Sequence, residues 1–274
     1  MKLGLIGTGK MGSALLRGAL RSDSLTPTDV VIYDHTVAHT EPLVRDYPTI
    51  SIASSPEELV NKVDVVILAV KPQGILDLLD QISAPFRTMI GTIGDDSPLF
   101  LSIAAGISLN KLEKVAFDGA RIIRVMPNTP ALIGKGTSVY CLGNNATNQD
   151  AQLVESLLAQ SGFIQLIDES KIDAVSAISG CGPAYMYVIL DALSDAGVAA
   201  GLPRALALEL ATRTMQGSAE LVLQSGRHPM SLRDDVTSPG GTTIAALNKL
   251  EQCGMRTALL QAVQAAYDQS LRLG

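Results

Sequence analysis

The sequence predicts an α/β protein with two domains, in which a doubly wound, mostly parallel sheet is followed by an all-helical domain. Three observations predict this fold. Short apolar segments alternate with helical segments across residues 1–167. A glycine-rich turn joins the first of these apolar segments to the first helix. From residue 168 onward the spacing of apolar residues is helical, and no segment has the character of a strand.

The first strand and the first helix are joined by a G-x-G-x-x-G motif. Leu3–Ile6 is a short apolar strand, and Gly7, Gly9 and Gly12 follow it at once. Gly7 permits a tight turn, Gly9 allows a pyrophosphate to approach the backbone, and Gly12 lets the helix pack against the strand. The motif is weak alone, but its position between a first strand and a helix is the context that supports it. We therefore expect a Rossmann-like dinucleotide-binding domain.

The second strand, residues 30–34, ends in Asp34. An acidic residue roughly 20 positions beyond the glycines usually accepts a hydrogen bond from the 2′-hydroxyl of the cofactor's ribose. Asp34 therefore favours NAD over NADP, which carries a 2′-phosphate. Two alternatives stay open. Asp34 could simply end a strand and face solvent, or His35 and Thr36 could hydrogen-bond a phosphate.

Further strands complete the predicted sheet at residues 64–70, 98–103, 120–125, 136–142 and 163–167, with a helix at 148–159. The continuous apolar run at 64–70 is typical of a parallel strand that is covered on both faces. Ligands of such sheets bind beyond the carboxyl ends of the strands. The residues expected to edge the cofactor cleft are Val70, Lys71, Pro72, Ala104, Ala105, Gly106, Asn128 and Thr129. A solvated Lys71 is an equal alternative, and tight packing also explains the small residues.

The second domain is predicted to be helical at residues 171–179, 184–199, 203–223, 242–252 and 256–271. These segments are rich in Ala, Leu, Val and Met and carry few charges for their length, so they need apolar partners on more than one side. About 105 residues provide only a limited core. We therefore expect pairing with a second subunit. The predicted domains are residues 1–167 and residues 168–274.

A second glycine-rich turn precedes the predicted helix at 242–252. Pro239, Gly240 and Gly241 interrupt regular structure, and Thr242 and Thr243 can cap the helix that follows. Unpaired backbone N–H groups and the helix dipole make such a turn a site for a small anion, for example a carboxylate. For an isolated motif of this length, an ordinary loop between helices is the more common explanation.

Composition restricts the partners of the protein. The chain has 274 residues, a net charge of -6 and no basic stripe, so we expect no nucleic acid. Cys141, Cys181 and Cys253 are widely spaced, which indicates no disulfide framework and fits a reducing cytoplasm. The His residues form no metal-ligand pattern, so no metal is expected. No apolar run is long enough to predict a membrane span.

The chain resembles pyrroline-5-carboxylate reductase over almost its whole length. Five motifs occur in order, namely GTGKMG from Gly7, LAVKP from Leu68, MPNTP from Met126, SGCGPAY from Ser179 and DVTSPGGTT from Asp235. The last is the most specific, and the others are shared with wider relatives. The resemblance implies reduction of 1-pyrroline-5-carboxylate to L-proline, the last step of proline biosynthesis, with NADPH or NADH. It also implies a homodimer with the substrate at the dimer interface, and larger assemblies of dimers.

The resemblance also implies a role for individual residues. The pyrophosphate would lie against Ile6, Gly7, Thr8, Gly9, Lys10 and Met11, with Asp34 and Thr36 near the adenosine ribose. The nicotinamide side would be lined by Ala69, Val70, Lys71, Pro72, Ala104, Ala105 and Gly106, and Asn128 with Thr129 would help to place the ring. The substrate carboxylate would be held by Ser238, Gly241, Thr242 and Thr243. The Thr243 hydroxyl would lie near the ring nitrogen and act as the catalytic residue.

The sequence departs from the family pattern at Asp34, because relatives that use NADP often lack an acid there. It also departs at Cys181, where Ser is frequent, and at Asp235, to which we assign no ligand role. Two other functions share part of this pattern. A β-hydroxyacid dehydrogenase would need a Lys on the helix that follows Gly182 to move a hydroxyl proton, and no Lys occurs between Gly182 and Lys249. A cofactor-binding redox sensor without turnover would be expected to have a degraded substrate loop.

Overall fold

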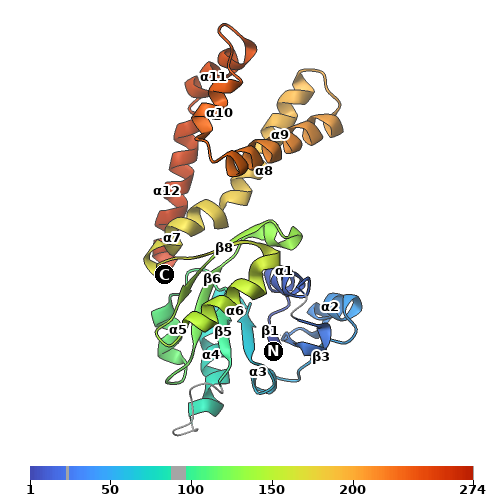
Figure 1. Cartoon of the computed structure of the whole chain (residues 1–274), viewed down its shortest axis with the longest axis vertical. Coiled ribbons are helices and arrows are strands. Elements are labelled where there is room, and N and C mark those ends of the chain that lie inside the picture. The colour runs from blue at the N-terminus through green and yellow to red at the C-terminus, as the bar shows by residue number, and fades with distance from the viewer. Residues whose placement is uncertain (23–24, 88–96, 274) are drawn as a thin grey trace. The chain divides into compact units, whose positions relative to one another are not determined.

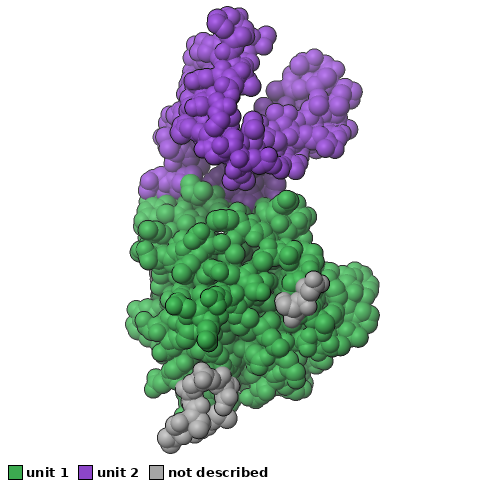
Figure 2. Space-filling model, viewed as in Figure 1, with its two compact units in different colours: residues 1–181, 267–274 green, residues 182–266 purple. Residues whose placement is uncertain are grey.

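The computed structural model describes residues 1–22, 25–87 and 97–273. The chain forms two compact units, which Figure 2 distinguishes by colour. Unit 1 comprises Met1–Cys181 together with Tyr267–Gly274, and unit 2 comprises Gly182–Ala266. The predicted domain division at residues 167 and 168 marks the change from strands to helices. The predicted domain boundary stays a prediction, since the boundary between the two compact units lies later in the sequence, at Cys181 and Gly182.

Among the described residues of unit 1, eight strands form one sheet (Figure 1). Their order in space is β3-β2-β1-β4-β5-β6-β7-β8. The strands are β1 Leu3–Ile6, β2 Val30–Tyr33, β3 Ser51–Ile52, β4 Val65–Leu68, β5 Leu99–Ser102, β6 Ile122–Met126, β7 Gly136–Leu142 and β8 Gly162–Leu166. Strands β1 to β6 are parallel, and the order of these six is that of a doubly wound dinucleotide-binding sheet. The predicted fold class is confirmed.

Two features of the sheet differ from the sequence-based prediction. β7 runs antiparallel to β6, and β8 pairs in parallel with β7. Only the short 3-10 helix η3, Thr129–Ile133, connects β6 to β7, and so short a connection cannot carry the chain back for a parallel pair. β3 was not predicted, because two residues are too few to show a periodic pattern.

Helices cover both faces of the sheet and create two separate cores. One core joins α1 Lys10–Ala19, α2 Glu41–Asp46 and α6 Asn148–Leu158 to alternate strand residues such as Leu5. The other joins α3 Pro56–Val60, α4 Pro72–Arg87 and α5 Leu109–Val115 to the opposite set, including Ile6. Because neighbouring strand residues face opposite layers, the strands are apolar at nearly every position.

The chain from residue 169 to 273 is helical, as predicted. The helices are α7 Ile172–Val175, α8 Gly182–Ala199, α9 Arg204–Ser225, α10 Pro229–Asp235, α11 Thr242–Gln252 and α12 Met255–Leu273. α10 was not predicted, since its seven residues are too few to show a helical period. In unit 2, α8 packs closely on α9, where a Cβ added at Gly197 would lie 2.8 Å from the Cβ of Ala207.

One segment of the described chain, Glu169–Ala199, is long and apolar enough to cross a membrane by length and composition alone. The sequence-based expectation of no such segment is wrong here. The two helices predicted at 171–179 and 184–199 were separated by a break, whereas a π-helical turn, Ser176–Gly180, leads from α7 almost directly into α8. Only 11% of the apolar window is buried within the chain. This exposed surface therefore requires a partner outside the single chain.

Candidate active site

The glycine-rich turn after β1 is held by contacts that leave no room for side chains at two of its positions. The Gly7 N–H donates to the Tyr33 carbonyl at 2.9 Å, and Gly7 has a φ of 96°. A Cβ at Gly7 would lie 2.6 Å from the Ala69 oxygen, and one at Gly12 would lie 2.3 Å from the Gly7 oxygen. Both glycines are therefore required by the fold of the turn and by the packing of α1.

Gly9 differs from these two glycines, because a Cβ at this position would meet no atom of the protein within 4 Å. Gly9 is the N-cap of α1, no side chain caps this helix, and its first turn contains no acid. The first N–H groups of a helix bind anions when no cap satisfies them, and the helix dipole favours negative charge there. The open space over Gly9 and the uncapped helix therefore fit a pyrophosphate.

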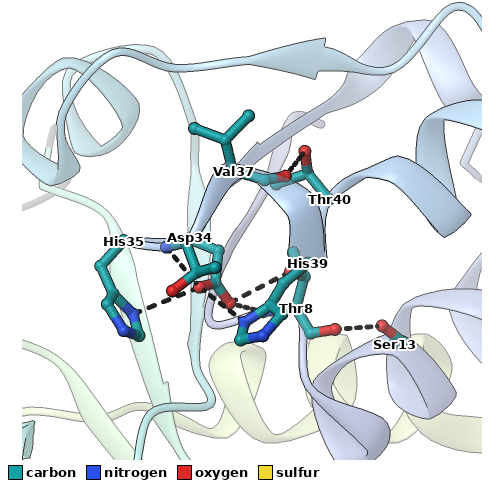
Figure 3. A network of polar contacts seen from close by, with 8 residues as sticks. Thr8, Ser13, Asp34, His35, Val37, His39 and Thr40 are labelled. Carbon is teal, nitrogen blue, oxygen red and sulfur yellow. Dashed lines mark hydrogen bonds and ion pairs between the residues drawn. The ribbon is translucent and has the colours of Figure 1, made fainter.

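Asp34 lies directly after β2, and its carboxylate is bound from several sides (Figure 3). Oδ2 accepts hydrogen bonds from the Thr8 N–H at 2.8 Å and from the Thr8 hydroxyl at 3.1 Å. Oδ1 accepts from the Thr36 N–H at 3.0 Å and from Nδ1 of His39 at 3.2 Å. Burial opposes ionisation, but the hydrogen bonds outweigh it and hold the pKa of Asp34 below its ordinary value.

The sequence did not indicate two members of this network. His39 lies on the 3-10 helix η2, Val37–His39, and Ser13 donates its hydroxyl hydrogen bond to the Thr8 carbonyl at 2.8 Å. Thr8 therefore connects the glycine turn to the end of β2 through both its backbone and its side chain. The spacing of His35 and His39, one helical turn apart, is the only sequence signal that could have suggested the pair.

The other predicted cofactor residues lie at the carboxyl ends of parallel strands. The Ala69 N–H donates to the Ile6 carbonyl at 2.8 Å, which places residues 69–72 beside the glycine turn. Lys71 is exposed. Residues 104–106 follow the neighbouring strand β5, and Gly106 has a φ of 73°. The structure therefore brings Ile6, the glycine turn and residues 69–72 and 104–106 to one edge of the sheet.

Asn128 is buried and holds three segments together. Its Nδ2 donates to the Ser179 carbonyl at 3.0 Å, and its Oδ1 accepts from the Thr137 N–H at 2.8 Å. These bonds join the turn after β6 to β7 and to the π-helical turn. Contact of Asn128 with a nicotinamide ring stays a prediction, and its side-chain amide is already engaged within the protein.

In unit 2 the predicted substrate loop connects α10 to α11. Arg227 and Asp235 form an ion pair at 2.6 Å across α10, which explains Asp235 without a ligand. The Gly241 N–H donates to the Ser238 carbonyl at 3.1 Å, and Gly240 has a φ of 68°. A Cβ at Gly241 would lie 2.4 Å from the Ser238 hydroxyl oxygen, so a side chain there would displace that hydroxyl from its place beside the turn.

The cap of α11 differs from the prediction. Gly241 is the N-cap, and Thr242 and Thr243 are the first two helical residues. No side chain caps this helix, and its first turn contains no acid. The end of α11 therefore resembles that of α1, with N–H groups and a dipole available to an anion. Ser238 and Thr242 are exposed beside it, and Thr243 is half-buried.

No group of three or more His, Cys, Asp or Glu residues that could hold a metal ion occurs in the described part of the chain. Two cavities of unit 1 lie at the Arg124–Glu169 ion pair and beside Cys141. Gly106 is the one predicted cofactor residue that lines either of them.

Two family models match the chain. The first, described as pyrroline-5-carboxylate reductase dimerisation, covers residues 169–273. The second, described as NADP oxidoreductase coenzyme F420-dependent, covers residues 2–90. The two matches agree with a nucleotide-binding first part and a helical second part that mediates association between subunits.

Proteins named pyrroline-5-carboxylate reductase are similar to this chain over nearly its full length. The protein from Arabidopsis thaliana is 41% identical over 272 residues, which is 99% of this chain and 95% of the relative. The protein from Synechocystis is 38% identical, covering 100% of this chain and 98% of the relative. These matches extend across both units, so they include both glycine turns.

Solved structures give the same result. The pyrroline carboxylate reductase of Plasmodium falciparum, determined with NADP bound, is 35% identical with a TM-score of 0.88, covering 100% of this chain and 98% of that one. The enzyme from Streptococcus pyogenes is 30% identical with a TM-score of 0.85, covering 98% of both chains. An imine reductase from Pseudomonas shares only the fold, with 14% identity and a TM-score of 0.57.

Proposed function

The chain belongs to the pyrroline-5-carboxylate reductase family, and we infer that it reduces 1-pyrroline-5-carboxylate to L-proline with NADPH or NADH, the last step of proline biosynthesis. The observation that carries this inference is shared by the N-termini of α1 and α11. The N-cap residue of each helix is a glycine, and no side chain forms a hydrogen bond to its first N–H groups. The reaction needs an anion site for a dinucleotide pyrophosphate and another for a small carboxylate. The chain supplies one such end in each part of its sequence.

For the cofactor, we assign the pyrophosphate to the glycine turn, Ile6 to Met11, because Gly9 leaves an open space before an uncapped helix. Asp34 and Thr36 are assigned to the adenosine side. The nicotinamide side is assigned to Ala69, Val70, Lys71, Pro72, Ala104, Ala105, Gly106 and Asn128. Their place at the carboxyl edge of the parallel strands supports this assignment.

For the substrate, we assign the carboxylate to Ser238, Gly241, Thr242 and Thr243. The N–H groups at the start of α11 supply donors, and the hydroxyls beside them add further hydrogen bonds. The Thr243 hydroxyl is assigned to the ring nitrogen. It orients the imine and acts as the catalytic residue of the site.

The reaction requires no strong general acid from the protein. The imine nitrogen takes its proton from water before reduction. A hydride then forms a bond to the imine carbon, and the electron pair of the C=N double bond moves to the nitrogen. When bound, the reduced nicotinamide supplies this hydride. The chain's own residues hold the carboxylate, exclude water and fix the orientation of the ring.

The protein has a dimerisation domain and is therefore a homo-oligomer. Its substrate is a small molecule. We propose a homodimer that can associate further, located in the cytoplasm, without a nucleic-acid or membrane partner. The acidic chain and its unpaired cysteines support this proposal. We assign the exposed apolar surface of Glu169–Ala199 to the subunit interface and not to a lipid bilayer.

The decisive experiment measures the oxidation of NADPH and NADH, separately, with 1-pyrroline-5-carboxylate as the acceptor. Thr243→Val removes the hydroxyl but keeps the shape of the side chain. Turnover should fall by about tenfold to a hundredfold, since a hydrogen bond to a charged group contributes about 1.5–3 kcal/mol. Binding of the cofactor should be unchanged. Thr212→Val is the matched control, because the Thr212 hydroxyl only donates to the Leu208 carbonyl within α9.

Unchanged kcat/KM in Thr243→Val would remove Thr243 from the mechanism without touching the assignment of the reaction. A wild-type protein that oxidises neither nucleotide with this substrate would refute the proposed function. The same assay with a hydroxyacid and the oxidised nucleotides tests the dehydrogenase alternative. That alternative lacks its proton shuttle, since α8 contains no lysine.

A further inference from the structure

The carboxylate of Asp34 is engaged by the protein itself. Its side chain is only 5% exposed. Thr8 donates two hydrogen bonds to Oδ2, and the Thr36 N–H donates one to Oδ1. A carboxylate that already accepts these bonds has little remaining capacity for a ribose hydroxyl. Asp34 therefore braces the glycine turn against the end of β2, and its contact with the ribose stays a prediction.

Two imidazole rings flank this carboxylate (Figure 3). Nδ1 of His35 and Nδ1 of His39 each lie 3.2 Å from Oδ1 of Asp34. The ring centroids are 6.2 Å apart, and the rings are nearly perpendicular. The side chains of His35 and His39 are 84% and 56% exposed. Both rings are therefore accessible to a ligand at the end of β2.

The carboxylate determines which nitrogen of the His39 ring carries the proton. An ionised carboxylate only accepts hydrogen bonds, so Nδ1 of His39, which is hydrogen-bonded to Oδ1 of Asp34, carries the hydrogen. Nδ1 of His35 lies at the same distance and forms an ion pair with the carboxylate when its ring is protonated. In the neutral ring, Nε2 is then a bare acceptor. In the protonated ring, Nε2 becomes a donor with positive charge. A hydroxyl can donate to the first form, whereas a phosphate can be bound only by the second.

We propose that His35 and His39, held by Asp34, form a proton-dependent selector for the 2′ position of the cofactor's adenosine ribose. The neutral rings accept a hydrogen bond from the 2′-hydroxyl of NAD(H). The protonated rings bind the 2′-phosphate of NADP(H), so this binding takes up protons from solution. The inference rests on the proposed function, because it requires the adenosine ribose to lie at the end of β2.

Other charged groups lie on the elements next to the pair. The neighbouring elements carry Lys10 at the start of α1 and Glu41, Arg45 and Asp46 on α2. Asp46 is already paired with Arg17 at 2.7 Å and lies 3.6 Å from Arg45. Their charges also act on the 2′-phosphate, which NAD lacks. These groups are the same in the wild-type protein and in a variant without the two imidazoles, so the comparison of the two proteins subtracts their effect and leaves the contribution of the rings.

The test measures dissociation constants of NADP⁺ and NAD⁺ for the whole protein by calorimetry, in buffers with different heats of ionisation. Between about pH 8 and pH 6.5, the affinity for NADP⁺ relative to NAD⁺ should rise roughly tenfold for one imidazole proton taken up. The buffers should report about one more proton bound with NADP⁺ than with NAD⁺. Calorimetry needs no turnover, so the result does not depend on the substrate loop.

The variant is the double substitution His35→Gln and His39→Gln, which keeps polar, exposed side chains of similar size. It should lose the additional proton uptake and the pH dependence of the affinity ratio. The ionisation of the 2′-phosphate, with a pKa of about 6, acts equally in the variant and is thereby subtracted. His228→Gln is the control, because His228 is the only other histidine and caps α10 through the Met230 N–H.

Proton NMR gives an independent measurement, since three histidines give three ring signals that the variants assign. NADP⁺ should raise the titration midpoints of His35 and His39 and leave that of His228 in place. Equal proton uptake for both nucleotides, or a double variant with wild-type pH dependence, would overturn the selector. A protein that binds neither nucleotide would instead refute the cofactor site of the proposed function.

Discussion

Three glycines within six residues meet different steric demands. Gly7 and Gly12 are required by the protein, because an added Cβ would collide with backbone oxygen atoms. Gly9 is not, because an added Cβ would point into open space. The sequence motif assigns a purpose to each position, but only the coordinates separate the glycines needed for folding from the one available for a ligand.

This separation gives a paired prediction. Gly12→Ala places a methyl group 2.3 Å from the Gly7 oxygen, so the free energy of unfolding should fall by about 1–3 kcal/mol. Gly9→Ala should cost less than about 1 kcal/mol, the range for exchanging the N-cap residue. It should nevertheless weaken nucleotide binding, because the methyl group fills the space assigned to the pyrophosphate. Chemical denaturation and calorimetric titration measure the two effects.

The reverse pattern would contradict the assignment. If Gly9→Ala bound both nucleotides with wild-type affinity, the open space above α1 would not be the pyrophosphate site. The assignment of residues 69–72 to the cofactor site would then also lose its support, since it depends on their contact with this turn.

Polar residues show what a sequence cannot reveal at this scale. Residue type and spacing identified Asp34 and Asn128 as members of the site, and both lie at the expected edge of the sheet or beside it. The sequence could not show that their side chains are engaged by Thr8, Thr36, Ser179 and Thr137, since these partners come from segments that meet only on folding. Such long-range bonds leave no local pattern.

At the scale of elements, an ion pair joins the sheet to the segment that leads into the helices. Oε1 of Glu169 lies 2.8 Å from Nη1 of Arg124 on β6, and it also accepts from the Leu109 N–H at 2.7 Å. The Arg124 side chain is only 7% exposed, whereas that of Glu169 is 31% exposed. One carboxylate therefore satisfies a buried guanidinium and the start of α5 together.

Glu169→Ala should destabilise the protein, because it leaves the Arg124 guanidinium buried without its counter-ion. Breaking a fully buried pair costs 3–5 kcal/mol, and the partial exposure of Glu169 reduces the expected loss to about 2 kcal/mol. Lys171→Ala is the matched control, since its pair with Asp168 at 3.5 Å is exposed and should contribute less than about 0.5 kcal/mol. Equal midpoints in urea for both variants would show that the buried pair adds no stability.

The limits of element prediction have the same physical basis. Strong apolar runs such as β4 and β5 were predicted to within two residues at each end. The direction of β7 depends on a short connection, and the link from α7 into α8 is a π-helical turn across Ser176–Gly180. The predicted helices end at residue 179 and resume at residue 184, because two glycines interrupt the apolar pattern between them. The backbone is instead helical, because Ser179 and Gly180 lie against Asn128 and Met126.

For the whole molecule, the exposed apolar surface of the helical part is its most consequential property. Apolar side chains with at least 40% exposure lie along α8 and α9, namely Met186, Tyr187, Val188, Leu193, Leu206, Leu208, Leu210, Leu221 and Leu223. A surface of this kind on a single chain indicates an interface. The dimerisation family model covers the same residues, so a second copy of the chain is the expected partner.

Val188→Asp tests this interface, since Val188 is 71% exposed on α8 in the single chain. A carboxylate buried between subunits would lack a partner, so the mass measured by light scattering should shift from oligomer to monomer as the protein is diluted. Ile133→Asp is the matched control, because Ile133 is 76% exposed but lies outside residues 169–273. It should keep the wild-type mass. An oligomer that survives Val188→Asp unchanged, or a wild-type protein that sediments with lipid vesicles, would show that this surface has another partner.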